Sequence, residues 1–529
     1  MAERRRKPKY IIGLDFGNSF SFPCYIPELD LAVSRLGGTP RDLLPADMHY
    51  GYHSVFFYSK KAADRCRGRQ VAPPPWCGED AVKARATPVR NRIRNLKRHL
   101  NQPLKLDDWE GSYDDAIVQL IQYLMRRANE VLETDTLTTS NLLSLSYPAT
   151  FTRAKCSHLK SLAERATLAD GTHIQVVGMI AEPAAAALDY LVENGREKQE
   201  TTVMTYDLGG GTFDLAIVSA YPQGRKNVNG QLYYYDIEST GGIEDLGGTE
   251  FDEVMYRLLQ AKVPKGEMVP EDSLRRLAET LKVDLSRDME SEAEIYSITG
   301  EAITLAVTRE EFERKALPLI QRTIQETQRT LRESRGKEPE LIVLTGGASQ
   351  MPAIQRELER AFPQFQGKIV MYRPSKAIAY GAARYGTEED RSDPVVENVV
   401  QQRVPRDIGI RFYIRDTEEQ YIDTCIHAGT PLPYSSDFER SATHFDDQKT
   451  SYFAVFEAKV EHPDNRQIER DYTEIMGVTL EHGGPVPKGT VSESRLVLNK
   501  DGLLKVEARD PSKPDKPPVH NECTLKNLS

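Results

Sequence analysis

The most informative hydrophobic pattern in the chain is an apolar run that ends in an aspartate and a glycine-rich turn. It occurs twice, as IIGLDFGNS at residues 11–19 and as VMTYDLGGGT at residues 203–212. A buried strand carries the aspartate to the edge of a sheet, and the glycines let backbone N–H groups approach an anion closely. One such turn is a weak signal, whereas two of them predict duplicated lobes that face a single nucleotide.

A third glycine turn follows another apolar run, in ELIVLTGGASQMPAIQRELERAF at residues 340–362. The apolar LIVL predicts a strand that leads directly into the glycines. Pro352 then opens a predicted helix, because Ile354, Leu358 and Phe362 recur on one face. Strand, glycine turn and helix in this order suit a flat or anionic ligand.

Two segments rich in small residues predict helices that pack closely. They are residues 183–188, within AEPAAAALDY, and residues 375–386, which read SKAIAYGAARYG. Packing is the ordinary role of such segments, and we expect these two helices to cross at a hinge between the lobes. A longer helix is predicted over residues 310–333, where apolar residues recur at i+4 spacing and Pro318 introduces a kink.

The pattern changes beyond the second of these small-residue helices. Residues 388–404 are polar, charged and bounded by proline, which predicts a linker. Apolar residues alternate over 408–414, and RLVLNKDGLLKVEARD at residues 495–510 predicts a hairpin around its Lys-Asp-Gly turn. Residues 405–529 are therefore expected to form an all-β unit with no C-terminal helical domain after it.

Composition and charge narrow the functional classes. With 529 residues, of which 39% are hydrophobic and 28% charged, the chain has the makeup of an ordinary globular protein. A formal net charge of −10 argues against a nucleic-acid partner. No apolar stretch approaches the ~20 residues of a membrane helix, and the apolar run near the N-terminus is too short for a signal peptide. The six cysteines show no CxxC spacing, so we expect neither zinc nor disulfides, and a cytoplasmic location.

Taken together, these segments resemble the heat-shock protein 70 family, the DnaK-type chaperones. IIGLDFGNS and TYDLGGGTFD are similar to the two phosphate loops, VLTGGASQMP to the adenosine loop, and AEPAAAALDY and AIAYGAA to the connecting helices. The resemblance implies an α/β actin-like ATPase domain of duplicated ribonuclease H-like lobes at residues 1–387. It further implies a linker at 388–404 and an all-β substrate-binding sandwich at 405–529, without the family's helical lid.

The resemblance also implies a site for ATP or ADP with Mg²⁺. Asp15, Asp207 and Glu182 would hold the metal through water, since Mg²⁺ usually keeps several waters. The implied catalytic residues are Lys97, Glu182, Thr212 and Asp214. The residues implied to contact the nucleotide are Gly17, Asn18, Ser19, Gly209, Gly210, Gly211, Thr212, Gly248, Glu279, Lys282, Ser286, Gly346 and Gly347.

Two of these roles carry the chemistry of phosphoryl transfer. Lys97 would stabilise charge on the transferred phosphoryl group, and Asp214 would orient the attacking water. If the family resemblance is left aside, Lys97 lies in a basic segment that is more typical of a solvated helix. Glu279 and Lys282 would likewise be exposed helix charges.

Several positions depart from the family's pattern. Asn18 replaces a threonine in the first phosphate loop, and Thr249 replaces a glutamate near the ribose. Gln350 replaces an arginine whose guanidinium would stack on adenine. Ser375 and Lys376 replace acidic residues before the second connecting helix. These changes predict weaker nucleotide binding and slow hydrolysis.

The leading hypothesis is an ATP-driven chaperone whose sandwich binds unfolded or extended polypeptide, with a J-domain protein and a nucleotide exchange factor as partners and no membrane partner. Ile422 and Phe453 are candidates for lining the peptide groove, although ordinary sandwich core is the favoured alternative. A second hypothesis is a nucleotide-gated scaffold for one dedicated protein, with little turnover. A third, a small-molecule kinase, is disfavoured by GGGTFD and by the predicted sandwich.

Overall fold

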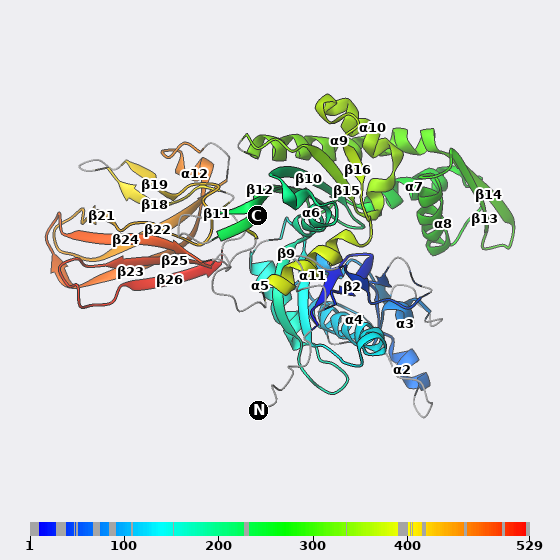
Figure 1. Cartoon of the computed structure of the whole chain (residues 1–529), viewed down its shortest axis with the longest axis horizontal. Coiled ribbons are helices and arrows are strands. Elements are labelled where there is room, and N and C mark those ends of the chain that lie inside the picture. The colour runs from blue at the N-terminus through cyan, green and yellow to red at the C-terminus, as the bar shows by residue number, and fades with distance from the viewer. Residues whose placement is uncertain are drawn as a thin grey trace. The chain divides into compact units, whose positions relative to one another are not determined.

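The computed structural model (Figure 1) describes residues 10–27, 39–46, 48, 51–66, 75–83, 91–106, 109, 111–151, 153–226, 232–334, 336–389, 400–401, 404, 406–414, 419–459, 463–499 and 503–524. Within these residues, no helix is both long and apolar enough to cross a membrane. The chain divides into two compact units. The first comprises Met1–Thr150, Ser157–Pro222 and Ser239–Asp393, and the second comprises Phe151–Cys156, Gln223–Glu238 and Pro394–Ser529.

Two sheets of the same topology form the centre of the first unit. One runs in the order β3 (Arg41–Asp42), β2 (Phe20–Tyr25), β1 (Ile12–Phe16), β8 (Leu142–Tyr147) and β9 (Gln175–Ala181), with β4 (Tyr52–His53) also paired to β2. The other runs β12 (Leu232–Ile243), β11 (Phe213–Lys226), β10 (Thr201–Leu208), β15 (Leu341–Thr345) and β16 (Ile369–Met371).

The strands that carry the two aspartates occupy equivalent places in these sheets. Each of β1 and β10 pairs antiparallel with the strand after its glycine turn and parallel with the next strand on its other side. The predicted duplication of lobes is therefore confirmed. The parallel pairing also brings the ends of β10 and β15 together, so the second and third glycine turns lie at one edge of the sheet.

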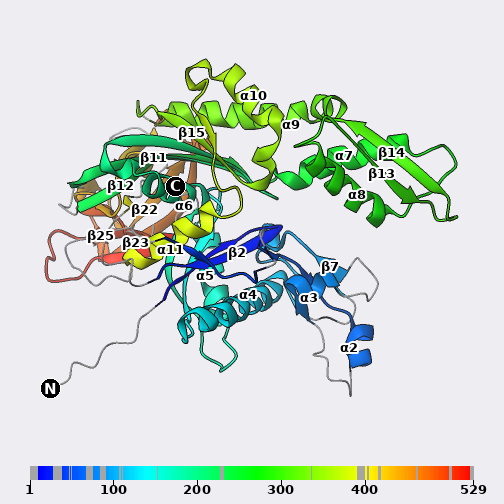
Figure 2. The ribbon, with the colours of Figure 1, turned by 45° about the vertical axis from the view of Figure 1, so that its right-hand side comes forward.

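Two helices built from small residues lie between the sheets (Figure 2). α6 (Glu182–Glu193) contacts β10, and α11 (Ala377–Glu389) contacts β1 and β8. At their crossing, a Cβ atom on Gly381 would lie 1.8 Å from the carbonyl oxygen of Ala185, so a side chain at this position has no room. The predicted crossing of the two helices is thus confirmed.

The other elements outside the β-rich second unit flank these sheets. The helices are α2 (Lys60–Cys66), α3 (Gly78–Lys83), α4 (Tyr113–Thr136), α5 (Arg153–Arg165), α7 (Gly248–Lys262), α8 (Glu271–Asp284), α9 (Arg309–Glu333) and α10 (Pro352–Ala361). The strands are β5 (Phe56–Phe57), β6 (Trp76–Cys77), β7 (Arg92–Ile93), β13 (Glu290–Tyr296) and β14 (Ala302–Thr308), and short 3-10 turns cover Leu96–His99, Arg196–Lys198, Gly347–Gln350 and Pro363–Phe365.

The predicted helices of this region are present, with small differences at their ends. α9 begins after Thr308, whose hydroxyl accepts a hydrogen bond from the backbone N–H of Glu311 at 3.2 Å, and it contains Pro318. α10 opens at Pro352 as expected but ends before Phe362. α6 is longer than residues 183–188 because apolar packing continues through Leu191.

The second unit is a sandwich of two sheets. One sheet runs β19 (Gln420–Ile426), β18 (Ile408–Tyr413), β22 (Gln448–Ala458) and β23 (Tyr472–Val486). The other runs β20 (Tyr434–Ser435), β24 (Val491–Leu498), β25 (Leu503–Arg509) and β26 (Val519–Thr524), with β21 (Glu439–Ala442) also paired to β24. β17 (Val400–Gln401) pairs with the part of β12 that belongs to this unit, and α12 (Ile468–Asp471) is a single helical turn.

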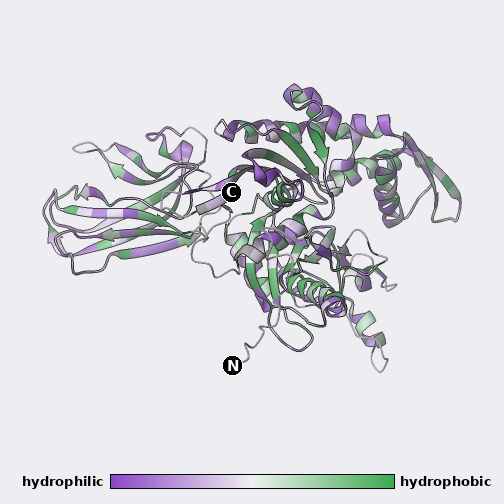
Figure 3. Ribbon diagram, in the orientation of Figure 1, coloured by the Kyte–Doolittle hydropathy of each residue, from purple (hydrophilic) through white to green (hydrophobic). Residues whose placement is uncertain are grey.

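Hydrophobic residues of both sheets form one core, and they alternate with hydrophilic residues along the strands (Figure 3). The predicted strand at 408–414 and the antiparallel hairpin of β24 and β25 are confirmed, whereas the turn at residues 500–502 and most of the predicted linker lie outside the described residues. Ile422 and Phe453 are 0% and 3% exposed. Phe453 belongs to the core between the two sheets, so the favoured alternative of ordinary sandwich core is confirmed for it and the groove assignment is wrong. Ile422 is buried in a separate, smaller cluster with Ala454, Phe456, Ala458 and Tyr472, so it does not line an open groove either.

Candidate functional site

All three glycine turns line one cavity of about 360 Å³ in the first unit. This size falls within the range of about 300–1,000 Å³ that is typical of small-molecule sites. The predicted site residues that line it are Asp15, Gly17, Asn18, Ser19, Lys97, Glu182, Asp207, Gly209, Gly210, Gly211, Thr212, Gly248, Glu279, Lys282, Ser286, Gly346 and Gly347. Asp214 is the one predicted site residue that does not line it, because its side chain is fully buried behind the cavity wall.

The first two glycine turns face each other directly. A Cβ atom on Gly210 would lie 2.2 Å from the hydroxyl oxygen of Ser19, and one on Gly211 would lie 2.7 Å from the amide nitrogen of Asn18. A side chain at either glycine would therefore displace the side chain of Ser19 or Asn18 from the opposite turn. The backbone of the second turn is closed by a hydrogen bond from the N–H of Gly209 to the carbonyl of Thr212 at 3.1 Å.

Three buried carboxylates, the half-buried carboxylate of Asp15 and one buried ammonium group lie at this end of the site. The ammonium of Lys97 pairs with the carboxylate of Glu182, and both side chains are almost fully buried. Burial, reinforced by Glu182 and opposed by Lys97, raises the pKa of Asp15 and of Asp214 to about 7. Burial together with the neighbouring carboxylates raises the pKa of Asp207 well above its ordinary value.

The buried carboxylates outnumber the single buried ammonium group, and this imbalance is typical of a cation-binding site. The Oδ1 atoms of Asp207 and Asn18 are buried and have no hydrogen-bond partner among the described residues. A divalent cation would compensate the ionised carboxylates that one lysine leaves unbalanced. Within the same residues, no three His, Cys, Asp or Glu side chains are close enough to hold a metal directly.

Lys97 is not a solvated helix residue. It lies in the 3-10 turn Leu96–His99 and is 3% exposed, so that alternative is wrong at this position. The neighbouring Arg94 does lie at the surface, where it pairs with Glu279 at 3.6 Å. The pattern of charges along the sequence does not tell which of Lys97 and Arg94 is buried, because both lie in the same short basic segment.

Arg98 and Glu250 support the site without lining the cavity, and sequence reasoning missed this role. The guanidinium of Arg98 donates to both carboxylate oxygens of Glu250, at 3.0 and 3.1 Å, and also to the carbonyl of Gly211. Glu250 accepts a hydrogen bond from the N–H of Gly247 at 2.7 Å, just before α7 begins. The pair therefore ties the second glycine turn to the start of α7. Its members are 152 positions apart, and no local pattern links them.

The far end of the cavity is formed by α7, α8 and the third glycine turn. Lys282 on α8 pairs with Asp252 on α7 at 2.5 Å and donates to the carbonyl of Gly248 at 3.3 Å. The alternative of an exposed helix charge therefore holds for Glu279 but not for Lys282. The lining residues that sequence reasoning left unnamed are Phe20, Phe22, Asp252, Val283, Arg287, Ala348, Met351, Pro374 and Ile378. Helical spacing from Glu279 was a usable signal for Val283 and Arg287, which follow it at i+4 and i+8.

Comparison with known proteins decides the family. A family model described as Hsp70 protein matches residues 117–526, which is more than half of the chain. The chain belongs to the Hsp70 family. Among curated relatives, a "Chaperone protein HscA homolog" of Burkholderia thailandensis is 27% identical over 541 residues, covering 96% of this chain and 78% of the relative. A protein of the same name from Burkholderia pseudomallei is 27% identical over 544 residues, with the same coverage of both chains.

Membership of the Hsp70 family matches the observed fold, an actin-like ATPase body and a β-sandwich. It also gives the chain a chaperone role and ATPase chemistry at the level of the family. Asp214, the one predicted residue outside the cavity lining, is the register partner of Asp207 and accepts a hydrogen bond from the N–H of Ala149 at 2.7 Å. Its side chain therefore lies beside that of Asp207, on the same face of the sheet.

Proposed function

We propose that this Hsp70 protein binds Mg²⁺·ATP in the cavity of its first unit and hydrolyses it slowly to control binding of extended polypeptide by its sandwich. The observation that carries the proposal is the convergence of three glycine turns on one cavity that also contains the buried pair of Lys97 and Glu182. Backbone N–H groups, carboxylates and one lysine suffice for phosphoryl transfer, in which the protein mainly positions groups and offsets charge.

The residues divide into metal-holding and reaction-supporting groups. Asp15, Asp207 and Glu182 hold Mg²⁺ through water, and the bound ion offsets the negative charge of the phosphates. Lys97 lines the cavity and offers its ammonium to the transferred phosphoryl group. Asp214 is fully buried and does not line the cavity, so it acts on the site through Asp207, its register partner, and its carboxylate is itself held by the N–H of Ala149.

Nucleotide affinity is expected to be modest. At the third glycine turn, Gln350 lines the cavity and donates to the carbonyl of Gly347 at 3.2 Å, so an amide rather than a guanidinium faces this end. An amide lacks the cation–π attraction that a guanidinium offers to a flat base. Isothermal titration with Mg²⁺·ATP that gave sub-micromolar affinity would contradict this expectation.

The client surface of the sandwich is proposed to be an exposed aromatic cluster. Tyr413 and Phe445 are 48% and 73% exposed. His444 connects them, with ring centroids 5.3 Å from Tyr413 and 5.7 Å from Phe445. Exposed large apolar side chains that gather in one place are typical of protein-binding surfaces. Extended polypeptide is the proposed client, with a J-domain protein and a nucleotide exchange factor as partners.

ATP turnover of the wild type beside Lys97→Ala and Thr212→Ala tests the proposal. We expect slow release of phosphate by the wild type, increased by an unfolded peptide, and a loss of about 100-fold or more in Lys97→Ala. Arg165→Gln is the matched control, because Arg165 forms only a surface pair with Asp115. Equal rates in all four proteins would refute the catalytic assignments, and tight nucleotide binding with no turnover would favour a nucleotide-gated scaffold.

A further inference from the structure

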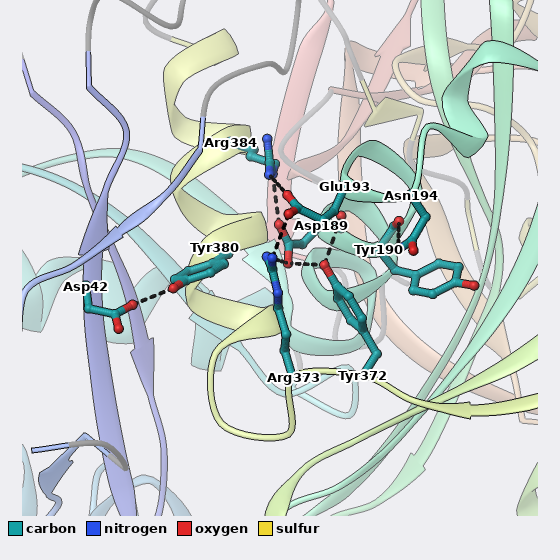
Figure 4. Close-up of polar contacts among 9 residues, drawn as sticks. All are labelled: Asp42, Asp189, Tyr190, Glu193, Asn194, Tyr372, Arg373, Tyr380 and Arg384. Atoms are coloured by element: carbon teal, nitrogen blue, oxygen red, sulfur yellow. Dashed lines mark hydrogen bonds and ion pairs between the residues drawn. The ribbon is translucent and has the colours of Figure 1, made fainter.

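A second group of charged side chains, two of them fully buried, lies where α6 and α11 pass each other (Figure 4). Two acids on α6 meet two arginines from α11 and from the segment before it. We call this group the α6–α11 ion cluster, and its members are Asp189, Glu193, Arg373 and Arg384. None of them lines the cavity.

Asp189 is the centre of the cluster. Its side chain is fully buried, as is that of Arg384, whose Nε lies 2.9 Å from Oδ1 of Asp189. Oδ2 of Asp189 accepts from Arg373 at 3.1 Å and from the hydroxyl of Tyr372 at 2.9 Å. Glu193, one helical turn further along α6, contacts the same two arginines at 2.7 and 3.2 Å. Two acids and two bases therefore balance each other where water does not reach the central pair.

The cluster holds a segment that leads to the cavity wall. Arg373 has a φ of 38°, in the left-handed region that residues other than glycine rarely adopt. The next residue, Pro374, lines the cavity and accepts a hydrogen bond from the N–H of Gly346 at 3.1 Å. Ser375 also lines the cavity. The ion pairs of Arg373 thus fix the backbone immediately before two residues of the wall.

The same segment is anchored from the first sheet. Asp42 on β3 accepts from the hydroxyl of Tyr380 at 2.5 Å and from the ammonium of Lys376 at 2.6 Å. The guanidinium of Arg373 lies 5.1 Å from the ring centroid of Tyr380. Because α6 packs on the second sheet and α11 on the first, these contacts join the two sheets beside the cavity.

We propose that the α6–α11 ion cluster positions the wall of the cavity that receives the nucleoside, with Asp189 as the positioning residue. Asp189 acts through Arg373, which sets the backbone of Pro374 and Ser375 against the third glycine turn. The phosphate end, formed by the first two glycine turns, does not depend on the cluster. This inference rests on the proposed nucleotide site, and it assigns the cluster to recognition of the nucleoside rather than to hydrolysis.

Two probes separate the ends of the cavity: Mg²⁺·ADP, which has a nucleoside, and Mg²⁺·pyrophosphate, which has none. In Arg373→Gln we expect the Kd of ADP to rise about five- to tenfold, while that of pyrophosphate stays within about twofold. Arg165→Gln is the surface control. Unchanged ADP affinity in Arg373→Gln, or an equal loss for both probes, would overturn the inference. A wild type that binds neither probe would instead refute the nucleotide site.

A second variant distinguishes positioning from stability. Asp189→Leu combined with Arg384→Met removes both buried charges together, and such replacements are often neutral for stability. We expect this double variant to unfold near the wild-type temperature but to show the same selective loss of ADP affinity, because Arg373 has lost its buried partner. Wild-type ADP affinity in a folded double variant would show that Asp189 positions nothing.

Discussion

The crossing of α6 and α11 predicts a large effect from the smallest possible substitution, Gly381→Ala. The added Cβ atom would lie 1.8 Å from the carbonyl oxygen of Ala185 and 2.4 Å from its carbonyl carbon. Ordinary contacts between such atoms are about 3.5 Å, so the helices would have to separate by more than about 1 Å. Overpacking of this kind costs about 1–3 kcal/mol, whereas the better helix propensity of alanine returns at most about 1 kcal/mol.

We therefore expect Gly381→Ala to lower the free energy of unfolding by about 1–2 kcal/mol and the Tm by at least about 2 °C. Thermal unfolding of the full chain followed by circular dichroism measures this. Gly484→Ala is the control, since no atom lies within 4 Å of its added Cβ, and its Tm should not change. A Tm at or above that of the wild type in Gly381→Ala would refute the close crossing, since the propensity gain would then act unopposed.

Three further outcomes are expected. Because the pKa of Asp15 and of Asp214 is raised to about 7 in the folded state, folding takes up protons, and without metal the Tm should fall as pH rises from 5 to 8. Mg²⁺·ATP should raise the Tm most at pH 8. A metal-free Tm that rises over this range would contradict the raised pKa values. Gly210→Ala should weaken Mg²⁺·ATP binding in isothermal titration, because its Cβ would overlap the opposite glycine turn, and unchanged affinity would refute the close approach. Burial and the neighbouring Asp423 raise the pKa of Glu439 to about 7, so the sandwich should lose stability as pH rises from 5 to 7, and Glu439→Gln should reduce that loss in urea titrations. The same pH profile in wild type and Glu439→Gln would refute the raised pKa of Glu439.

The sequence predicted those parts of the fold and site that local pattern determines. An apolar strand, an aspartate and a glycine turn form one continuous segment, so the positions of Asp15 and Asp207 at sheet edges could be anticipated. The alternation of Ile408 and Ile410 likewise marked a strand with one buried face. For Phe453 the sequence left a groove and a core both open and favoured the core, which the structure confirms, because an apolar residue in a strand does not by itself distinguish the two.

What the sequence did not reveal depends on contacts between distant segments. The partners Asp189 and Arg384 are 195 positions apart, and each lies in a helix whose small residues suggested packing alone. The three bonds of Arg98 join it to two segments beyond position 210. The burial of Lys97 follows from the path of the whole chain around its short turn rather than from its basic neighbours.

The packing of α11 on the first sheet limits the order in which a newly made chain can fold. A Cβ atom on Gly13 in β1 would lie 2.5 Å from the backbone nitrogen of Ala383 in α11, so β1 is covered by a helix that comes much later in the chain. A nascent chain cannot complete the packing of β1 until residues 377–389 have left the ribosome. Until then, an apolar strand stays uncovered, and uncovered strands are the segments that pair wrongly during folding.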